Sequence, residues 1–211
     1  MHSAHAASVR RSSQSLGSVN HVPAAAIATY ASAMFLLISM ASSAAADEWD
    51  EAARAIVRLP PEAFPDLPAS VTAELRKRGC TVPQPTSFTS TKANAISGSF
   101  ARAGQIDYAA LCSRNGSSHI FVIWGGPTRC PPVLQNADDR SYLQVVDPPK
   151  IGYSRFIVPA TQRAIAYYRA NVGGPKPPDT RHAGIEDVFA EKASAIFYCS
   201  RGRWKKLQGM D

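Results

Sequence analysis

Apolar residues recur at helical spacing in two segments that follow residue 46. Residues 47–58 place Trp, Ala, Ile and Val side chains on one stripe, which predicts a helix that ends before Pro60. A second helix is predicted over Ala69–Arg78, with basic residues in its last turn, where they complement the helix dipole, and with Gly79 after it. Residues 47–78 are therefore expected to form a helical lead-in.

Beyond residue 93 the pattern changes to short apolar segments typical of strands. The expected strands cover 95–100, 106–113, 118–124, 142–146, 153–158, 193–199 and 203–207. Asn115-Gly116 is a strong hairpin signal because both residues tolerate positive φ. A second hairpin is expected to turn at Arg201-Gly202. Between these strands, Thr161 is expected to cap a helix that runs to Asn171.

These elements predict one α+β domain over residues 47–211, in which residues 93–211 form a sheet-rich core. We expect an antiparallel sheet of about 5–7 strands, two N-terminal helices and one later helix. The regular alternation of strands and helices that builds a parallel sheet is absent from the pattern. A chain of 211 residues has room for one such domain beside a targeting segment.

Residues 1–46 have the pattern of a secretory signal peptide and are expected to lie outside the domain. Arg10 and Arg11 precede an apolar run from Ala24 to Met40, and small residues follow as far as Ala46. A basic start, an apolar core and a small-residue site are the parts of a cleavable signal. We predict cleavage after Ala46 and a periplasmic or secreted protein without a stable membrane span. The alternative is an N-terminal membrane anchor formed by the same apolar run.

The four cysteines all follow the predicted cleavage site, at Cys80, Cys112, Cys130 and Cys199. An even number of cysteines in an exported chain predicts disulfides. Of the three possible pairings we favour Cys80–Cys112, which ties the end of a helix to a strand, with Cys130–Cys199, which ties a loop to a late strand. Neither C-x-x-C nor H-x-x-x-H spacing occurs, which makes a zinc site the weaker alternative.

The chain is basic, with 23 Lys and Arg against 16 Asp and Glu. Such an excess favours acidic partners such as nucleic acid, anionic lipid or cell-wall polymers. The dense basic runs are short, at 76–78 and 201–206, and no basic strip interleaved with aromatic residues resembles an RNA-binding surface. We therefore expect no nucleic-acid partner. An envelope protein or polymer is the expected kind of partner instead.

Two groups of residues are candidates for function. His182, Glu186 and Asp187 form the densest polar cluster and would suit acid–base hydrolysis if they converged in a cleft, whereas a solvated loop would give them no such role. Trp124 and Trp204 are expected to rim one end of the sheet, where exposed aromatics and arginines form contact surfaces, unless they pack into the core. We expect no cofactor. A non-catalytic binding or accessory module of the bacterial cell envelope is the favoured interpretation, and a hydrolase is the alternative.

Two parts of the chain resemble each other. Residues 103–110 and 183–190 share Ala, Gly, Asp and a final Ala, and residues 118–121 resemble residues 194–197. This similarity predicts two related strand–turn–strand units in one sheet. Chance similarity between two amphipathic hairpins is the alternative.

Each unit also resembles the integrin-type FG-GAP repeat, whose calcium loop has the form D-x-[DN]-x-D-G-x-x-D. Asp179 and Asp187 fit the first and last acidic positions of that loop, but Arg181 and Ala183 replace the acids between them. Because calcium takes about six to eight oxygen ligands, a calcium-binding module is a further alternative only. Asp107 and Asp187 are instead expected to bind backbone N–H groups at turns.

The longest resemblance is to a set of uncharacterised exported bacterial proteins. It is carried by residues 78–84, 104–113, 173–178 and 184–208, which together span most of the chain after the signal. The resemblance implies export and a single domain, and it implies no activity.

Overall fold

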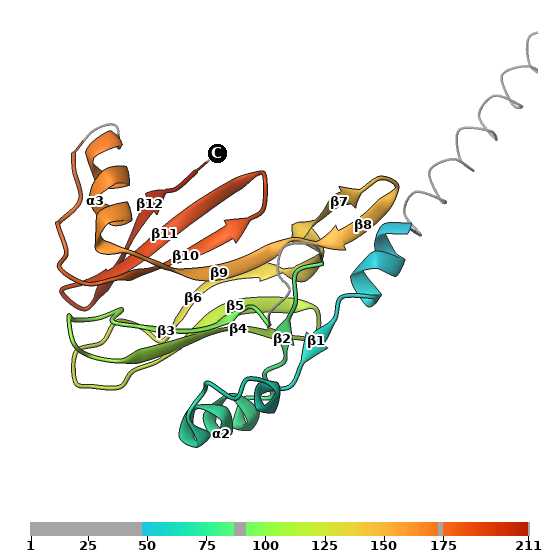
Figure 1. Cartoon of the computed structure of the whole chain (residues 1–211), viewed down its shortest axis with the longest axis horizontal. Coiled ribbons are helices and arrows are strands. Elements are labelled where there is room, and N and C mark those ends of the chain that lie inside the picture. Colours follow the sequence, from blue (N-terminus) through green and yellow to red (C-terminus); the bar gives the residue numbers. More distant parts are fainter. Residues whose placement is uncertain (1–47, 87–91, 173–174, 211) are drawn as a thin grey trace, which may run out of the picture. The chain divides into compact units, whose positions relative to one another are not determined.

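Two antiparallel sheets of four strands each face one another in the computed structural model of the protein (Figure 1). The structure describes residues 48–86, 92–172 and 175–210. All of these residues belong to one contact unit that spans residues 44–211. The predicted signal peptide and its cleavage site lie outside the described residues.

The first sheet has the strand order β3-β4-β5-β6. Its strands are β3 (Ala95–Gly98), β4 (Asp107–Arg114), β5 (Ser117–Ile123) and β6 (Val133–Asp138). As predicted, Asn115 and Gly116 turn the central hairpin, with φ angles of 51° and 80°. β6 was not predicted from the sequence. Its inward and outward positions do not alternate cleanly, because the register of β5 and β6 shifts between Ser118 and Ile120.

The second sheet has the order β12-β11-β10-β9. Its strands are β9 (Arg155–Ala160), β10 (Gly184–Phe189), β11 (Ala193–Ser200) and β12 (Arg203–Gln208). The predicted turn at Arg201-Gly202 joins β11 to β12, with φ angles of 51° and 74°. The α+β class with antiparallel sheets is thus correct, whereas the single sheet of five to seven strands is wrong.

The two similar units also lie apart from each other. One is the β4–β5 hairpin of the first sheet and the other is the β10–β11 hairpin of the second. Alternation along a strand shows which residues share a face, but it carries no information on which strands become neighbours. The prediction that both units share one sheet is therefore wrong.

The core lies between the two sheets. Its buried members include Leu111 and Ile120 from the first sheet and Ile157, Ile185 and Phe197 from the second. Burying such a side chain stabilises the fold by roughly 1.5–3 kcal/mol relative to leaving it exposed. The apolar side chains that alternate along these strands therefore hold one sheet against the other.

Helices cover the outer faces of both sheets. α2 (Ala69–Lys77) packs Val71 and Leu75 against the first sheet, and α3 (Gln162–Asn171) packs Ile165 against the second. The side chain of Thr161 accepts a hydrogen bond from the backbone N–H of Ala164 at 3.1 Å, so Thr161 caps α3 as predicted.

The segment before residue 95 departs from the predicted lead-in. The first helix covers residues 48–54 and ends before residue 58, because β1 (Arg58–Leu59) pairs with β2 (Val82–Pro83). β2 lies in residues 81–92, a segment whose Pro, Thr and Ser residues are typical of a loop. Short 3-10 helices, η1 (Pro61–Ala63) and η2 (Asp139–Tyr142), and the hairpin of β7 (Leu143–Asp147) with β8 (Lys150–Tyr153) add elements that the pattern does not predict.

Two disulfides reinforce these contacts. Cys80, just after α2, is bonded to Cys112 of β4, and Cys130, in the β5–β6 loop, is bonded to Cys199 of β11. This is the pairing favoured from the sequence. The second bond joins a loop of the first sheet to a strand of the second. Within the described residues, no helix has the length and apolar character needed to cross a membrane.

Candidate functional site

The predicted acid–base cluster does not converge. Glu186 and Asp187 are adjacent on β10, so their side chains leave the strand on opposite faces. Glu186 accepts a hydrogen bond from the hydroxyl of Ser194 at 2.6 Å. Both ring nitrogens of His182 lie against backbone carbonyl oxygens, at 2.7 and 2.8 Å. The three side chains therefore contact different groups. They do not meet within reach of one another, as the acid and the base of one site must.

Asp187 instead forms a buried ion pair with Arg155 of β9. The Nε and Nη2 atoms of Arg155 donate to the two carboxylate oxygens of Asp187, each at 2.9 Å. The same guanidinium donates to the hydroxyl of Ser118 at 2.9 Å and to the carbonyl of Gln135 at 3.0 Å, and it lies over the ring of Tyr142. Arg155 thus ties the second sheet to β5 and β6 of the first. Burial acts to lower the pKa of Arg155, but hydrogen bonding and charge attraction from Asp187 outweigh burial and raise it.

The contacts of Asp187 also argue against a calcium loop at the second of the two similar units, residues 183–190. Both oxygens of Asp187 are held by Arg155, and Asp179 is exposed, 4.0 Å from Arg169. Among the residues that the structure describes, no three His, Cys, Asp or Glu side chains gather closely enough to hold a metal ion. Asp179 and Asp187 are therefore not brought together as ligands.

Asp107 has the role predicted for it. Its buried carboxylate accepts hydrogen bonds from the backbone N–H groups of Phe100, Ala101 and Gly125 at 3.0, 3.1 and 3.0 Å. The side chain of Gln105 donates a fourth, at 2.6 Å. One carboxylate thereby joins the β3–β4 connection to the end of β5. Asp187, the equivalent residue of the other unit, was expected to do the same, but it faces a guanidinium instead of backbone N–H groups.

Trp124 and Trp204 meet at the same end of the two sheets. Their rings are stacked, with centroids 5.7 Å apart and an interplanar angle of 30°. The indole N–H of Trp204 donates to the carbonyl of Pro131 at 2.8 Å, and both rings pack against the Cys130–Cys199 disulfide. The tryptophans are half-buried. They hold the two sheets together, and they do not form an open aromatic platform.

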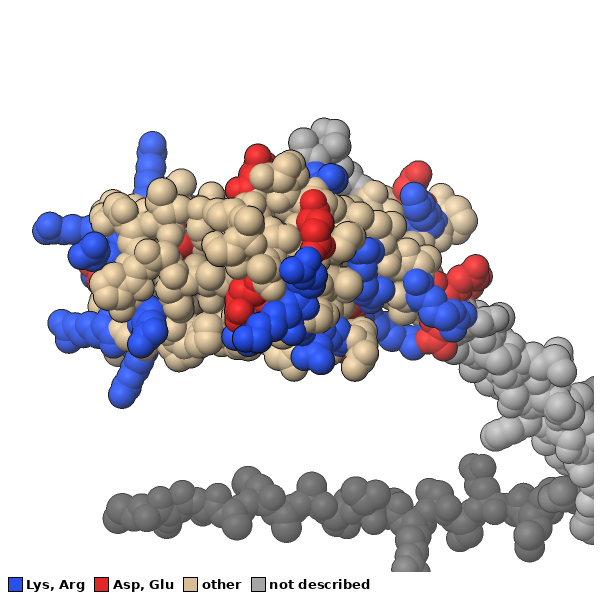
Figure 2. Space-filling model, turned by 90° about the horizontal axis from the view of Figure 1, so that it is seen from below, with Lys and Arg blue, Asp and Glu red and all other residues tan. Residues whose placement is uncertain are grey.

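Five exposed arginines surround this stack, and we name them the arginine end. They come from four connections and from the first residue of β12: Arg102, Arg129, Arg181, Arg201 and Arg203. Figure 2 shows Lys and Arg side chains projecting from the end of the molecule at the left. None of the five guanidinium groups makes an ion pair or hydrogen bond with residues 48–86, 92–172 or 175–210.

Covalent and hydrogen-bonded contacts bring these five residues together. The Cys130–Cys199 disulfide joins the neighbour of Arg129 to the strand that leads to Arg201. A Cβ atom placed on Gly202 would lie 4.0 Å from the backbone oxygen of Arg129, and the ring of His182 contacts the carbonyl of Cys199. Ala101, the neighbour of Arg102, packs against the same disulfide. The arginine end is therefore built by the fold from residues that are far apart in the sequence.

Sequence reasoning missed most of this surface. It singled out the run at 201–206, but Arg102 and Arg129 each stand alone among uncharged neighbours within two residues, and Arg181 has only Asp179 as a charged neighbour in that range. The one signal that points to part of the cluster is the favoured Cys130–Cys199 pairing, because it implies that residues 129 and 201 are close. His182, Glu186 and Asp187 were candidates only because they lie close together in the sequence.

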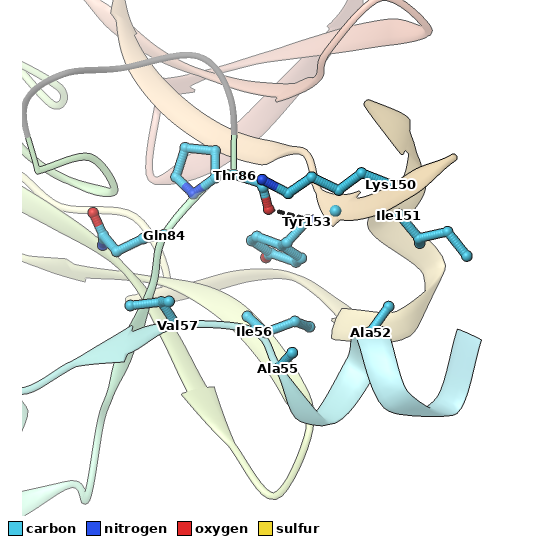
Figure 3. Close-up of a pocket in the computed structure, with 11 residues that line it drawn as sticks. Ala52, Ala55, Ile56, Val57, Gln84, Thr86, Lys150, Ile151 and Tyr153 are labelled. Atoms are coloured by element: carbon cyan, nitrogen blue, oxygen red, sulfur yellow. Dashed lines mark hydrogen bonds between the residues drawn. The ribbon is translucent and has the colours of Figure 1, made fainter. Parts of the chain in front are cut away.

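One cavity, of about 290 Å³, lies beside the helix over residues 48–54 (Figure 3). Its walls are mainly apolar, with Ala52, Ile56 and Ile151 among them. The hydroxyl of Thr86 is engaged by the backbone N–H of Tyr153 at 2.9 Å, as Figure 3 shows. Lys150 is the one charged residue among those that line this cavity. The other polar side chains among the lining residues are those of Gln84 and Tyr153.

A second cavity, of about 230 Å³, opens between the edge strands β6 and β12. Asp187 and Tyr142 line it together with Lys206, and the carboxylate of Asp187 is paired with Arg155. Burial, and after it the charge of Asp187, raise the pKa of Tyr142, so its hydroxyl stays protonated at neutral pH. The carboxylate at this cavity is occupied by Arg155, which leaves no free base beside the tyrosine.

The chain was compared with protein families, curated proteins and solved structures. No protein family, curated protein or solved structure matches the chain. The residues and their geometry are therefore the basis for a functional proposal.

Proposed function

We propose that the protein is an exported, disulfide-stapled module of the bacterial cell envelope that binds an anionic partner without catalysing a reaction. The arginine end is the binding surface. The observation that carries this proposal is the gathering of five exposed guanidinium groups that have no carboxylate partner among the described residues. Guanidinium groups bind phosphate and carboxylate in a bidentate manner, and several together give a salt-dependent affinity.

The rigidity of the surrounding loops supports binding at this end. Asp107 holds the β3–β4 connection, which carries Arg102, and the Cys130–Cys199 disulfide holds the loop that carries Arg129. Ordering these loops before the partner arrives lowers the entropy cost of association. A preorganised cationic surface is expected to bind more tightly than the same number of arginines on mobile segments.

Catalysis by the hydrolase alternative has less support. Glu186 and Asp187 lie on opposite faces of β10, and the ring of His182 is engaged by backbone carbonyl groups on both sides. A hydrolytic site needs a base within reach of a nucleophile or water in an open cleft. The contacts of these residues favour a structural role for all three.

The test is retention on immobilised heparin, a soluble polyanion. We expect the wild-type protein to elute above about 200 mM salt, because several cation–anion contacts make binding steeply salt-dependent. The charge-reversed variant Arg102→Glu/Arg129→Glu/Arg203→Glu should elute near the start of the gradient. These positions are exposed, so the variant should retain the wild-type melting temperature.

A matched control separates a local site from overall charge. Arg54→Glu/Lys150→Glu/Lys192→Glu changes the net charge by the same amount at exposed positions outside the arginine end. We expect this control to elute close to the wild type. Equal losses in both triple variants, or no retention of the wild type at low salt, would overturn the proposal.

A further inference from the structure

We propose that the anionic partner is the surface of a phospholipid bilayer, and that the arginine end acts there together with an adjoining apolar strip. This inference rests on the proposed function and names its ligand. The apolar strip lies on the outer face of the first sheet and consists of Ile106, Tyr108, Ile123 and Val133.

Register and packing place these four residues on one face. Tyr108 is opposite Ile123 in the β4–β5 pair, and both pack beside the apolar cluster under α2. Val133 is opposite Phe121, a member of that cluster. Ile106 lies two residues before Tyr108, so strand alternation continues the same row. The apolar strip therefore extends the surface that α2 covers elsewhere.

The apolar strip is exposed where α2 does not cover it. Ile106 is 62% exposed and Val133 is 46% exposed, whereas Phe121, beneath the α2 region, is buried. In Figure 2, which views the molecule from below, an uncharged area separates the Lys and Arg side chains of the left end from the mixed charges farther right. Ile106 follows Arg102 by four residues, and Val133 follows Arg129 by four, so these exposed apolar side chains lie close along the chain to two members of the arginine end.

The combination of the two surfaces favours a bilayer over a soluble polyanion. A phosphate-bearing polymer in water would contact the arginines and gain little from Ile106 or Val133. At a membrane surface, arginines bind lipid phosphate groups while neighbouring apolar side chains enter the boundary between headgroups and acyl chains. The proposed contact is with the surface of the bilayer.

The experiment is co-sedimentation of the protein with two vesicle preparations. One contains phosphatidylcholine alone, and the other contains three parts of phosphatidylglycerol to seven parts of phosphatidylcholine. We expect binding to the anionic vesicles only, and loss of that binding in the Arg102→Glu/Arg129→Glu/Arg203→Glu variant. Added salt should weaken binding without abolishing it, because the apolar contacts are not screened.

A pair of apolar variants isolates the strip. Ile106→Ser/Val133→Ser should bind the anionic vesicles at least about fivefold more weakly and still elute from heparin like the wild type. The matched control is Val57→Ser/Val145→Ser, which alters residues that are 59% and 51% exposed outside the strip. This control should bind vesicles like the wild type. Melting temperatures of both variants verify that they fold.

The outcomes distinguish the two proposals. Retention on heparin without binding to anionic vesicles would overturn the bilayer and leave a soluble polyanion as the partner. Vesicle binding that Ile106→Ser/Val133→Ser leaves unchanged would overturn the role of the apolar strip. Absence of heparin retention by the wild type at low salt would overturn the proposed function itself, and the bilayer proposal with it.

Discussion

Arg155 makes hydrogen bonds between the two sheets that its neighbours in the sequence do not predict. It is buried completely, and its guanidinium connects Asp187 on its own sheet with Ser118 and Gln135 on the other. A buried charge is tolerated only when it is paired and its hydrogen-bond donors are satisfied. The sequence offers no signal for this role, since Arg155 lies in a strand and resembles a surface residue.

Breaking this pair should be costly. We expect Asp187→Asn to lower the free energy of unfolding by about 3–5 kcal/mol, because Arg155 would keep its charge without a counterion in the core. Equilibrium unfolding in urea measures the change. Asp179→Asn, at an exposed carboxylate, serves as the control and should change stability by less than about 0.5 kcal/mol. Similar effects of the two substitutions would contradict the role assigned to the ion pair.

His119 should make stability depend on pH. Partial burial, followed by the charges of Arg114, Arg155 and Arg78, lowers the pKa of His119 below its ordinary value of 6.5. The unfolded chain therefore takes up a proton at a higher pH than the folded protein does. Stability is fully present above pH 6.5 and is lost as the pH falls below that value.

The measurement compares His119→Gln with the wild type in urea at several pH values between about 7.5 and 5. We expect the difference in unfolding free energy between the two proteins to change across this range in favour of the variant at low pH. Carboxylates titrate alike in both proteins, so the difference isolates His119. A difference that stays constant with pH would show that His119 titrates equally in the folded and unfolded states.

At the scale of elements, signals in the sequence were sufficient to predict those features whose contacts are formed by residues close together in the chain. The turn at Asn115-Gly116 and the cap at Thr161 depend on residues within a few positions, and both are present. β6 and the pairing of β1 with β2 were not predicted. The β6 register is irregular, and a two-residue strand depends on a partner elsewhere in the chain.

The loops of the arginine end provide a prediction at this scale. Replacing Cys130 and Cys199 with alanine should lower stability by about 4 kcal/mol, since the bond closes a loop with a sequence separation of 69. It should also lower the salt concentration at which the protein elutes from heparin, because Arg129 and Arg201 would no longer be held together. Thermal unfolding and the heparin gradient measure the two effects.

The other disulfide is the control. Replacing Cys80 and Cys112, whose separation is 32, should also destabilise the protein, by slightly less on the same entropy argument. It lies at α2 and β4, so the elution from heparin should remain unchanged in the folded variant. Equal changes in elution for both double variants would contradict the local role of Cys130–Cys199.

At the scale of the whole molecule, export and two disulfides form one consistent hypothesis. The pairing of all four cysteines suits an oxidising compartment, and the apolar run before Ala46 predicts how the chain would reach it. The proposed surface needs such a location, because it would contact the envelope from outside the cytoplasm.

Intact mass spectrometry of protein recovered from a secreting bacterial host tests this hypothesis. We expect a chain that begins at Asp47 and takes up alkylating reagent at cysteines only after reduction. Recovery of the full chain with reactive thiols would contradict both cleavage and oxidation. A full chain without reactive thiols in the membrane fraction would support the N-terminal anchor instead.

The sequence by itself determined the α+β class, most strand segments, the two glycine turns of the hairpins, the helix cap and the favoured cysteine pairing. Apart from the cysteine pairing, which was favoured among three possibilities, each of these follows from propensity, spacing or alternation along a short stretch of chain. Only the tertiary structure decided that the strands divide between two sheets, that Asp187 meets Arg155 and that five separate arginines gather at one end. Those contacts depend on long-range strand register, because periodicity assigns a residue to a face but does not choose the partner across it.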